Sequence, residues 1–252
     1  MLRKVAGVSI VVFALAIAAC SKLQEKPVVD FVMKDFYTES SAGCRTVDSI
    51  PCATYEVKYP SFLSLDTTVR QAINERVCFI LNGSEGPGKS MKEMGDEFVK
   101  DFNSFMKDMP GYELTWYFKG FVEVMVSTDT LISLRVDSES FTGGAHGTYN
   151  TSFVNVDPKT GTAYLLDAML REGWKDELNR LAEEDLREQF GVTGSDSISG
   201  PDFPEEQFRL NDNYGFRKEG IVFFFNDYEK PVFAEGPTEI LIPYEKLQDW
   251  IK

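Results

Sequence analysis

The stretch that decides the fold is Ser140-Phe141-Thr142-Gly143-Gly144-Ala145-His146-Gly147-Thr148-Tyr149. It holds the single histidine of the chain, His146, within a cluster of glycines. Glycine adopts positive φ angles and permits close approach of other backbone, so we predict a shaped loop here rather than a generic turn. Segments with strand-like alternation flank the loop on both sides, and we predict that it joins two strands.

From Tyr112 onward the apolar residues have a period of two, which is typical of half-buried strands. Lys119-Gly120 and Thr128-Asp129 interrupt the alternation, and we interpret both pairs as turns. The predicted strands cover residues 114–118, 121–127, 131–139 and, after the glycine loop, 148–156. Together they predict an antiparallel meander.

Helical periodicity lies on both sides of this meander. Asp66 is a suitable N-cap for a helix with one apolar face, and a second helix is predicted over residues 90–108. A third helical region begins at Asp167. Further strands are predicted over residues 53–59 (ended by Pro60), 164–166, 208–210, 220–225 and 238–242, with a closing helical turn over 247–251.

Strands and helices come in blocks and do not alternate strictly, which is typical of an α+β fold. We therefore predict an antiparallel β-meander sheet with packed helices, in two related subdomains. The expected boundaries are residues 30–145 for the N-terminal subdomain and 146–252 for the C-terminal one.

The N-terminus predicts export. Arg3 and Lys4 precede an apolar run over residues 8–19, which ends in a sequence, Ile17-Ala18-Ala19-Cys20, that resembles the lipobox of bacterial lipoproteins. We expect residues 1–19 to be a signal peptide, Cys20 to carry diacylglycerol and palmitate, and residues 20–29 to be a tether. The expected location is the bacterial cell envelope, lipid-anchored to a membrane on its periplasmic or surface side. A secretory signal with an incidental cysteine is the alternative.

The charge excludes some partners. Removing residues 1–19, which contain two basic and no acidic residues, takes the formal net charge from -14 to -16. Nucleic acids and anionic lipid surfaces are bound by clustered Lys and Arg, so neither is an expected partner of the folded part. The only expected contact with a membrane is through the lipid on Cys20. The acidic balance suits a basic partner, or serves solubility alone.

The remaining cysteines predict one disulfide. Cys44 and Cys52 flank a turn-forming stretch, and an exported chain can keep a bridge between them. Cys78 lies in an apolar helical run and is expected to be buried and unpaired. With no CxxC spacing and one histidine, no metal site and no cofactor are expected.

Two motifs suggest chemistry that the context does not support. Residues 83–90, Gly-Ser-Glu-Gly-Pro-Gly-Lys-Ser, match the GxxxxGK[ST] pattern of phosphate-binding loops. The residues before them continue a helical pattern and no βαβ repeat follows, so we predict a loop between two helices. A serine hydrolase would need His146 in its triad, and no G-x-S-x-G elbow is present. We therefore expect His146 to be structural or to contact a ligand.

Several short motifs occur in order along the second half of the chain: Gly143–His146, Asp157–Gly161, Leu165–Asp167, Tyr228-Glu229 and Ala234–Pro237. With them, the C-terminal half resembles the domain of unknown function found in RsiV-type anti-sigma factors and PdaC-type peptidoglycan deacetylases. The N-terminal half, with Tyr59-Pro60, resembles the companion domain that usually precedes it. The resemblance covers most of residues 50–250.

RsiV-type proteins bind lysozyme outside the cell, and the resemblance implies an extracytoplasmic recognition module of that kind. The cytoplasmic sigma-binding part and a deacetylase domain are not expected in this chain. The expected function is a non-enzymatic envelope lipoprotein that binds a basic, lysozyme-like protein or a cell-wall ligand. The candidate binding residues are Thr142, Gly143, Gly144, His146 and Tyr149. A glycan- or peptide-modifying hydrolase that uses carboxylates, and a structural or assembly lipoprotein, are the alternatives.

Overall fold

The computed structural model describes residues 29–44, 51–83, 88–193, 208–227, 229 and 236–252. The predicted signal peptide, Cys20 and all but the last residue of the 20–29 tether lie outside these ranges. Four α-helices and two sheets make up the described part, which confirms the α+β class.

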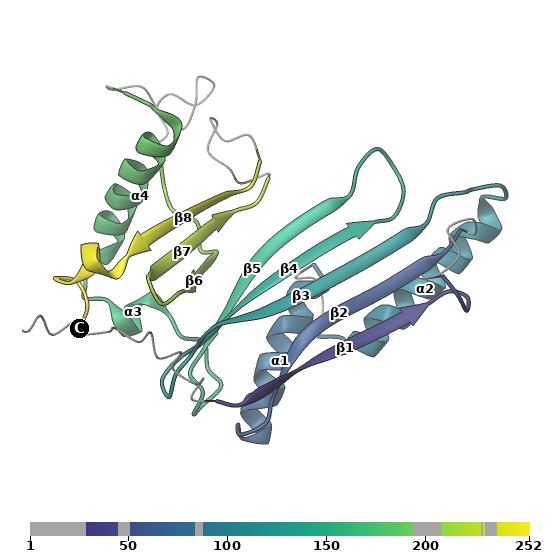
Figure 1. The fold of residues 1–252 in the computed structure, drawn as a ribbon, viewed down its shortest axis with the longest axis horizontal. Coiled ribbons are helices and arrows are strands. Elements are labelled where there is room, and N and C mark those ends of the chain that lie inside the picture. Colours follow the sequence, from purple (N-terminus) through teal and green to yellow (C-terminus); the bar gives the residue numbers. More distant parts are fainter. Residues whose placement is uncertain (1–28, 45–50, 84–87, 194–207, 228, 230–235) are drawn as a thin grey trace, which may run out of the picture.

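The first sheet has five strands in the order β1-β2-β3-β4-β5. Their bounds are Phe31–Glu39 (β1), Ala53–Phe62 (β2), Trp116–Ser127 (β3), Ile132–Phe141 (β4) and Thr148–Val156 (β5). All neighbours are antiparallel except β2 and β3, which run parallel because two helices connect them. These helices, α1 (Thr67–Leu81) and α2 (Met91–Asp108), lie on one side of the sheet (Figure 1).

Both helices begin where the sequence predicts. The Asp66 side chain accepts a hydrogen bond from the backbone N–H of Thr68 and caps α1. Ser90 and Glu93 form a reciprocal capping box at the start of α2. The stretch that resembles a phosphate-binding loop therefore connects two helices, as predicted, and its last residue, Ser90, is the N-cap of α2.

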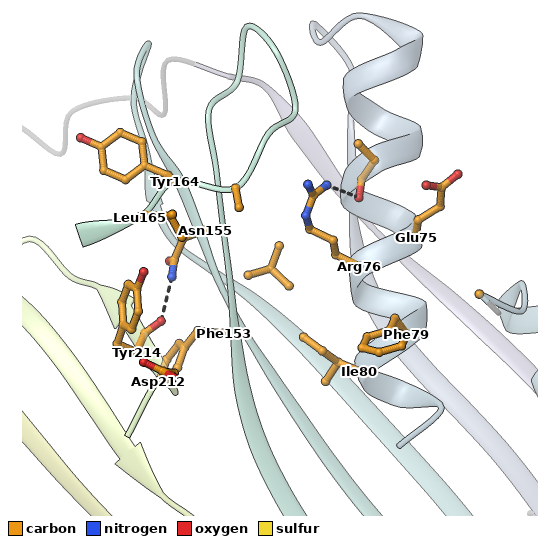
Figure 2. Close-up of a pocket in the computed structure, with 14 residues that line it drawn as sticks. Glu75, Arg76, Phe79, Ile80, Phe153, Asn155, Tyr164, Leu165, Asp212 and Tyr214 are labelled. Carbon is orange, nitrogen blue, oxygen red and sulfur yellow. Dashed lines mark hydrogen bonds between the residues drawn. The ribbon is translucent and has the colours of Figure 1, made fainter. Parts of the chain in front are cut away.

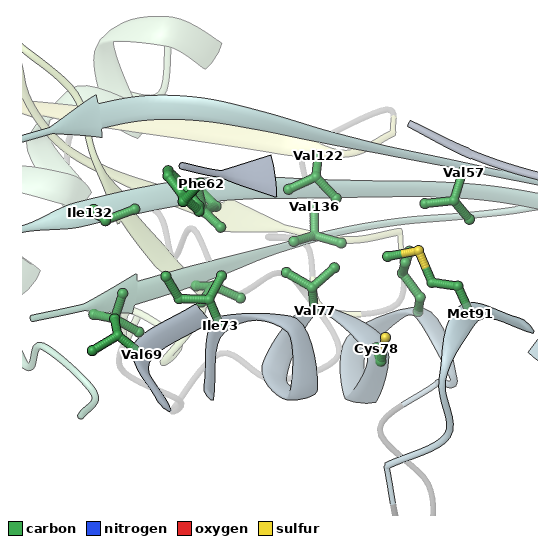
Figure 3. Close-up of a cluster of buried hydrophobic side chains, with 14 of the residues drawn as sticks. Val57, Phe62, Val69, Ile73, Val77, Cys78, Met91, Val122, Ile132 and Val136 are labelled. Atoms are coloured by element: carbon green, nitrogen blue, oxygen red, sulfur yellow. The ribbon is translucent and has the colours of Figure 1, made fainter. Parts of the chain in front are cut away.

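A core lies between α1 and the first sheet (Figure 3). Val69, Ile73 and Val77 of α1 follow helical spacing and face the strands. Their partners on the sheet include Val57, Val122, Ile132 and Val136, all of them fully buried. Full burial of an aliphatic side chain of this size contributes about 1.5–3 kcal/mol.

Lys119-Gly120 is not a turn. β3 runs through both residues without interruption, so the two strands predicted on either side of them are one strand. A Cβ atom on Gly120 would lie 3.1 Å from Cδ2 of Leu81 and 3.2 Å from the γ-carbons of Val57. The glycine therefore serves the close approach of α1 to the sheet.

Pro60 also lies inside a strand, because β2 continues to Phe62. Pro60 pairs with Met33 of β1, whereas the pairing of β2 with β3 ends at Lys58. A proline has no backbone N–H to donate, and it is tolerated where one side of the strand has no partner. The prediction that Pro60 ends the strand was wrong for this reason.

The second sheet contains β6 (Tyr214–Phe216), β7 (Gly220–Phe225) and β8 (Thr238–Pro243), and α4 (Trp174–Phe190) packs on it. The predicted strands over 220–225 and 238–242 are confirmed. Residues 208–210 are not a strand. Residue 163 makes a single bridge to Val156, and the short helix α3 (Leu166–Met169) follows, in place of the predicted strand over 164–166. The closing turn is a 3-10 helix at Tyr244–Leu247, earlier than predicted.

Polar side chains join the two sheets. Ser133 accepts a hydrogen bond from the Phe216 N–H (2.9 Å) and donates to Oδ1 of Asn155 (2.7 Å). Nδ2 of Asn155 donates to the Tyr214 carbonyl (2.7 Å). Arg135 forms an ion pair with Glu239 (3.2 Å). We call this group of six residues the inter-sheet seam.

β5 pairs with β4 over its whole length, so the first sheet extends to Val156. The subdomain boundary predicted between Ala145 and His146 therefore lies within the β4–β5 connection. Figure 1 shows the second sheet and α4 beyond β5, away from α1 and α2.

The three cysteines within the described residues behave as predicted. Cys44 and Cys52 form a disulfide with a Cα–Cα distance of 5.7 Å, and Cys78 is buried and free. Within the described ranges, no helix combines the length and the apolar composition needed to cross a membrane.

Candidate functional site

One face of the first sheet carries neither α1 nor α2. The second sheet covers part of it, at Ser133 and Arg135, and leaves the remainder open. Where the covered and open parts meet, the surface is hollowed into a cavity of about 560 Å³. Its walls come from β3, β4 and β5 of the first sheet and, in the second sheet, from β7 and the residues next to β7 and β8. They include Lys119, Phe121, Arg135, Asp137, Glu139, Tyr149, Thr151, Phe224 and Pro237.

A carboxylate and two tyrosines form the centre of the open face. Oε1 of Glu139 accepts hydrogen bonds from the hydroxyls of Tyr117 (2.6 Å) and Tyr149 (3.2 Å). Nζ of Lys119 lies 3.9 Å from Oε2 of Glu139 and 4.8 Å from the centroid of the Tyr117 ring. We call these four residues the Glu139 cluster.

Strand register brings the Glu139 cluster together. Lys119 on β3 lies opposite Glu139 on β4, and Glu139 lies opposite Tyr149 on β5. Tyr117 is two residues from Lys119 and shares its face, because side chains of a strand alternate. Cross-strand neighbours of this kind lie close enough for direct side-chain contact.

The shared carboxylate changes the acidity of both phenols. Its hydrogen bond favours the protonated phenol and raises the pKa of Tyr117 from 10.0 to about 12. The same interaction raises the pKa of Tyr149. Both hydroxyls therefore stay protonated, and keep donating to Glu139, to a higher pH than an ordinary tyrosine would.

These shifts predict a loss of stability at high pH. The pKa of Tyr117 is higher in the folded state than in the unfolded state. The contribution of Tyr117 to the free energy of unfolding is therefore complete below about pH 10 and is lost as the pH rises to about 12. Glu139→Gln should move part of the phenolate absorbance to lower pH, measured by ultraviolet titration of the folded protein. Tyr117→Phe identifies the affected phenol, and an identical titration of wild type and Glu139→Gln would contradict the assignment.

A second set of contacts holds the covered wall of the cavity. Nε of Arg135 donates to Oδ1 of Asp137 (2.9 Å), and the guanidinium lies 5.1 Å from the centroid of the Phe224 ring. The Thr151 hydroxyl donates to the same Asp137 oxygen (2.6 Å). Asp137 is thus fixed by Arg135 of its own strand and by Thr151 of β5.

The glycine loop lies at the end of the β4–β5 hairpin. Gly143 and Gly144 have φ of +101° and +102°, which confirms a shaped loop. Thr142, Gly144 and His146 are exposed, and Nδ1 of His146 lies 3.1 Å from its neighbour's carbonyl oxygen. A Cβ on Gly143 would lie 2.6 Å from the Tyr112 hydroxyl, so this loop packs against the chain before β3.

Of the five predicted binding residues, Tyr149 is the one in the Glu139 cluster. Tyr117, Lys119 and Glu139 were not predicted from the sequence. The alternation of Tyr117 and Lys119 is visible in the sequence, but the interpretation of Lys119-Gly120 as a turn divided the one strand that carries both. Glu139 lies on the next strand, and the sequence does not show that it is their neighbour. Among the described residues, no three His, Cys, Asp or Glu side chains are grouped so that they could hold a metal ion.

Comparison with known families separates the chain into two parts. Residues 167–245 match the family model described as "Protein of unknown function (DUF3298)", and residues 47–149 match the model described as "Deacetylase PdaC". Both types of domain are found, and the PdaC-type match lies in the N-terminal half, where the sequence predicted a companion domain and no deacetylase domain. The Glu139 cluster lies in the PdaC-type part, and the second sheet lies in the DUF3298-type part.

Solved structures share the fold over nearly the whole chain. A DUF3298 family member from Bacteroides fragilis NCTC 9343 superposes with a TM-score of 0.66 at 22% identity, covering 90% of this chain and 96% of that one. A DUF3298 family protein from Pseudomonas aeruginosa PAO1 gives a TM-score of 0.56 at 18% identity, covering 90% and 95%. No curated protein matches the sequence. The domain of unknown function is thus confirmed, and the specific likeness to RsiV stays a prediction.

Proposed function

We propose that this chain is a non-enzymatic ligand-recognition protein of the bacterial cell envelope, lipid-anchored at Cys20. The lipobox-like end of the N-terminal apolar run supports the anchor. The Glu139 cluster and the neighbouring Phe121 form the recognition surface.

The observation that carries this proposal is the fixing of two tyrosines by one carboxylate on an open sheet face. An aromatic side chain that is already held in place loses little conformational entropy when a partner binds it. Tyr149 is 59% exposed and Phe121 is 46% exposed, so a partner can bury substantial apolar area on both. Aromatic residues of this kind carry much of the binding energy in protein interfaces.

The net charge supports a basic partner. Without residues 1–19 the formal net charge is -16, since the full chain has -14 and these residues carry two positive charges; such a protein attracts a basic protein over long range, which raises the association rate and makes it sensitive to salt. The most specific candidate ligand is a lysozyme-like protein, and the alternative ligand is a cell-wall glycan or peptide.

Calorimetric titration of the protein beginning at Ser21 with hen egg-white lysozyme tests the proposal. We expect binding that weakens between low and moderate salt. Tyr149→Ala should weaken it about tenfold, which corresponds to about 1.4 kcal/mol. Phe190→Ala is the matched control, because Phe190 is also an exposed aromatic residue but lies on α4.

Two results would go against the proposal. An absence of heat at micromolar concentrations would remove lysozyme as the partner. Equal losses for Tyr149→Ala and Phe190→Ala would remove the Glu139 cluster as the binding surface.

Hydrolysis by carboxylates is the second candidate, because Asp137 and Glu139 line the same cavity. Asp137 already accepts from Arg135 and Thr151, and Glu139 accepts from two tyrosines. Both carboxylates thus serve to position neighbours, which favours binding over catalysis. Mass spectrometry of peptidoglycan fragments after incubation with the protein separates the two functions, since hydrolysis changes their mass and binding does not.

A further inference from the structure

A larger cavity, of about 770 Å³, lies between α1 and the outer edge of β5 (Figure 2). It shares no lining residue with the cavity beside the Glu139 cluster. One wall is formed by Arg76, Phe79 and Ile80 of α1. The opposite wall is formed by Phe153 and Asn155 of β5, by Tyr164 and Leu165, and by Asp212 and Tyr214.

The outer edge of β5 offers backbone hydrogen bonds to this cavity. The Thr151 N–H donates to Oδ1 of Asn226 (2.9 Å), and the Asn155 carbonyl accepts from the Tyr164 N–H (2.9 Å). Backbone groups of alternate residues point to the same side of a strand, so the N–H and C=O of Phe153, midway between them, also point outward. Among the described residues, neither group of Phe153 has a partner on that side.

The α1 wall adds a cation. Nη1 of Arg76 donates to the Ala72 carbonyl of its own helix (3.0 Å), and no described carboxylate lies within ion-pair distance of it. In Figure 2 the Arg76 guanidinium faces the cavity, whereas the Glu75 carboxylate points away from it. The remaining guanidinium N–H groups are therefore available to an anion, and a carboxylate fits their planar geometry.

Apolar groups complete the walls. Phe79 is 42% exposed on α1 and Leu165 is 55% exposed on the other wall. A group that enters between them would bury apolar surface on both sides at once, which favours an aliphatic or aromatic side chain. A backbone donor and acceptor, a cation and an apolar slot are the complement of one chemical class, an extended peptide with a free carboxylate.

We propose that this cavity binds the carboxyl-terminal end of an extended peptide. The peptide backbone pairs with the N–H and C=O of Phe153, its terminal carboxylate binds Arg76, and an apolar side chain lies between Phe79 and Leu165. This site is independent of the recognition surface on the open sheet face.

The probes are N-acetyl-Ala-Leu-Ala and N-acetyl-Ala-Phe-Ala, each as the free acid and as the carboxamide, titrated up to millimolar concentration and followed by amide chemical shifts. We expect shifts at Phe153, Arg76 and Leu165, with the acids binding about tenfold tighter than the amides because they keep a charge-assisted hydrogen bond. Arg76→Met should remove that difference and leave the amides unaffected. Arg70→Met, on the same helix but outside the cavity, should change neither.

N-methylation of each peptide amide in turn tests the backbone pairing, since one position should lose binding while its side chains are unchanged. The proposal fails if no probe shifts the resonances of the cavity, or if shifts appear at the Glu139 cluster alone. It fails equally if acid and amide bind alike and Arg76→Met has no effect, or if no N-methylated probe is weakened. Thermal unfolding of Arg76→Met confirms that the variant is folded in each comparison.

Discussion

Gly220→Ala is expected to destabilise the protein by about 3 kcal/mol, at the upper end of what overpacking usually costs. A Cβ atom on Gly220 would lie 2.1 Å from the carbonyl oxygen of Ile242 and 2.8 Å from Cα of Pro243. Both are backbone atoms of β8, which pairs with β7 at this point. No side-chain rotation can relieve the clash, so the two strands must separate. Equilibrium denaturation in urea measures the loss.

Gly88→Ala is the matched control. Gly88 has no atom within 4 Å of the Cβ position and does not have a positive φ. A surface substitution without such constraints changes the free energy of unfolding by about 0.5 kcal/mol or less. If the two alanine variants unfold at the same urea concentration, the inference that β8 leaves no room for a side chain at Gly220 is wrong.

Local signals explain the parts of the fold that the sequence predicts well. The starts of α1 and α2 follow from Asp66 and from the Ser90–Glu93 capping box, each of which acts within three residues. β5 has the predicted bounds, because the glycine loop before it and the turn at Asp157–Gly161 after it are both built from residues with strong conformational preferences.

Non-local contacts explain the failures. The local sequence around Gly120 looks like that of a turn. The glycine is needed instead because Leu81, which is distant in the sequence, packs against it. β1 was missed because it is an edge strand on which the adjacent Val32 and Met33 are both exposed, so no alternation marks it. The parallel pairing of β2 with β3 likewise depends on how α1 and α2 cross the sheet.

Of the four residues of the Glu139 cluster, only Tyr149 was predicted from the sequence. Tyr149 was identified from the neighbouring glycine loop, but its partners depend on the register of three strands. That register includes a shift between Val124 and Val126, where β3 departs from regular pairing with β4. A one-residue change of register would move Tyr117 and Glu139 to opposite faces, and the sequence alone does not determine it. A role for His146 in binding stays a prediction.

Phe216→Ala is expected to cost about 3–5 kcal/mol, the usual loss for truncating a fully buried phenylalanine. Phe216 has no exposed surface, and its ring makes edge contacts with those of Tyr164 (5.6 Å) and Tyr214 (5.9 Å). Alanine keeps the backbone N–H that donates to Ser133, so the loss reports packing in the second core and not the inter-sheet seam. Phe121→Ala is the control, since its exposed ring on the open sheet face should cost below about 1 kcal/mol while weakening ligand binding.

The same variant tests whether the two sheets unfold together. The cores of the first and second sheets contain separate sets of residues, and the inter-sheet seam joins them through buried and half-buried polar contacts. Unfolding of the second sheet alone would break these hydrogen bonds and expose Ser133 and Phe216, which are both fully buried while the sheets are packed together. We therefore expect Phe216→Ala to shift one common transition, seen alike by tryptophan fluorescence and by far-ultraviolet circular dichroism. Two transitions, with only the lower one moved, would show that the seam does not couple the sheets. The open face and its Glu139 cluster could then stay folded without the DUF3298-type part.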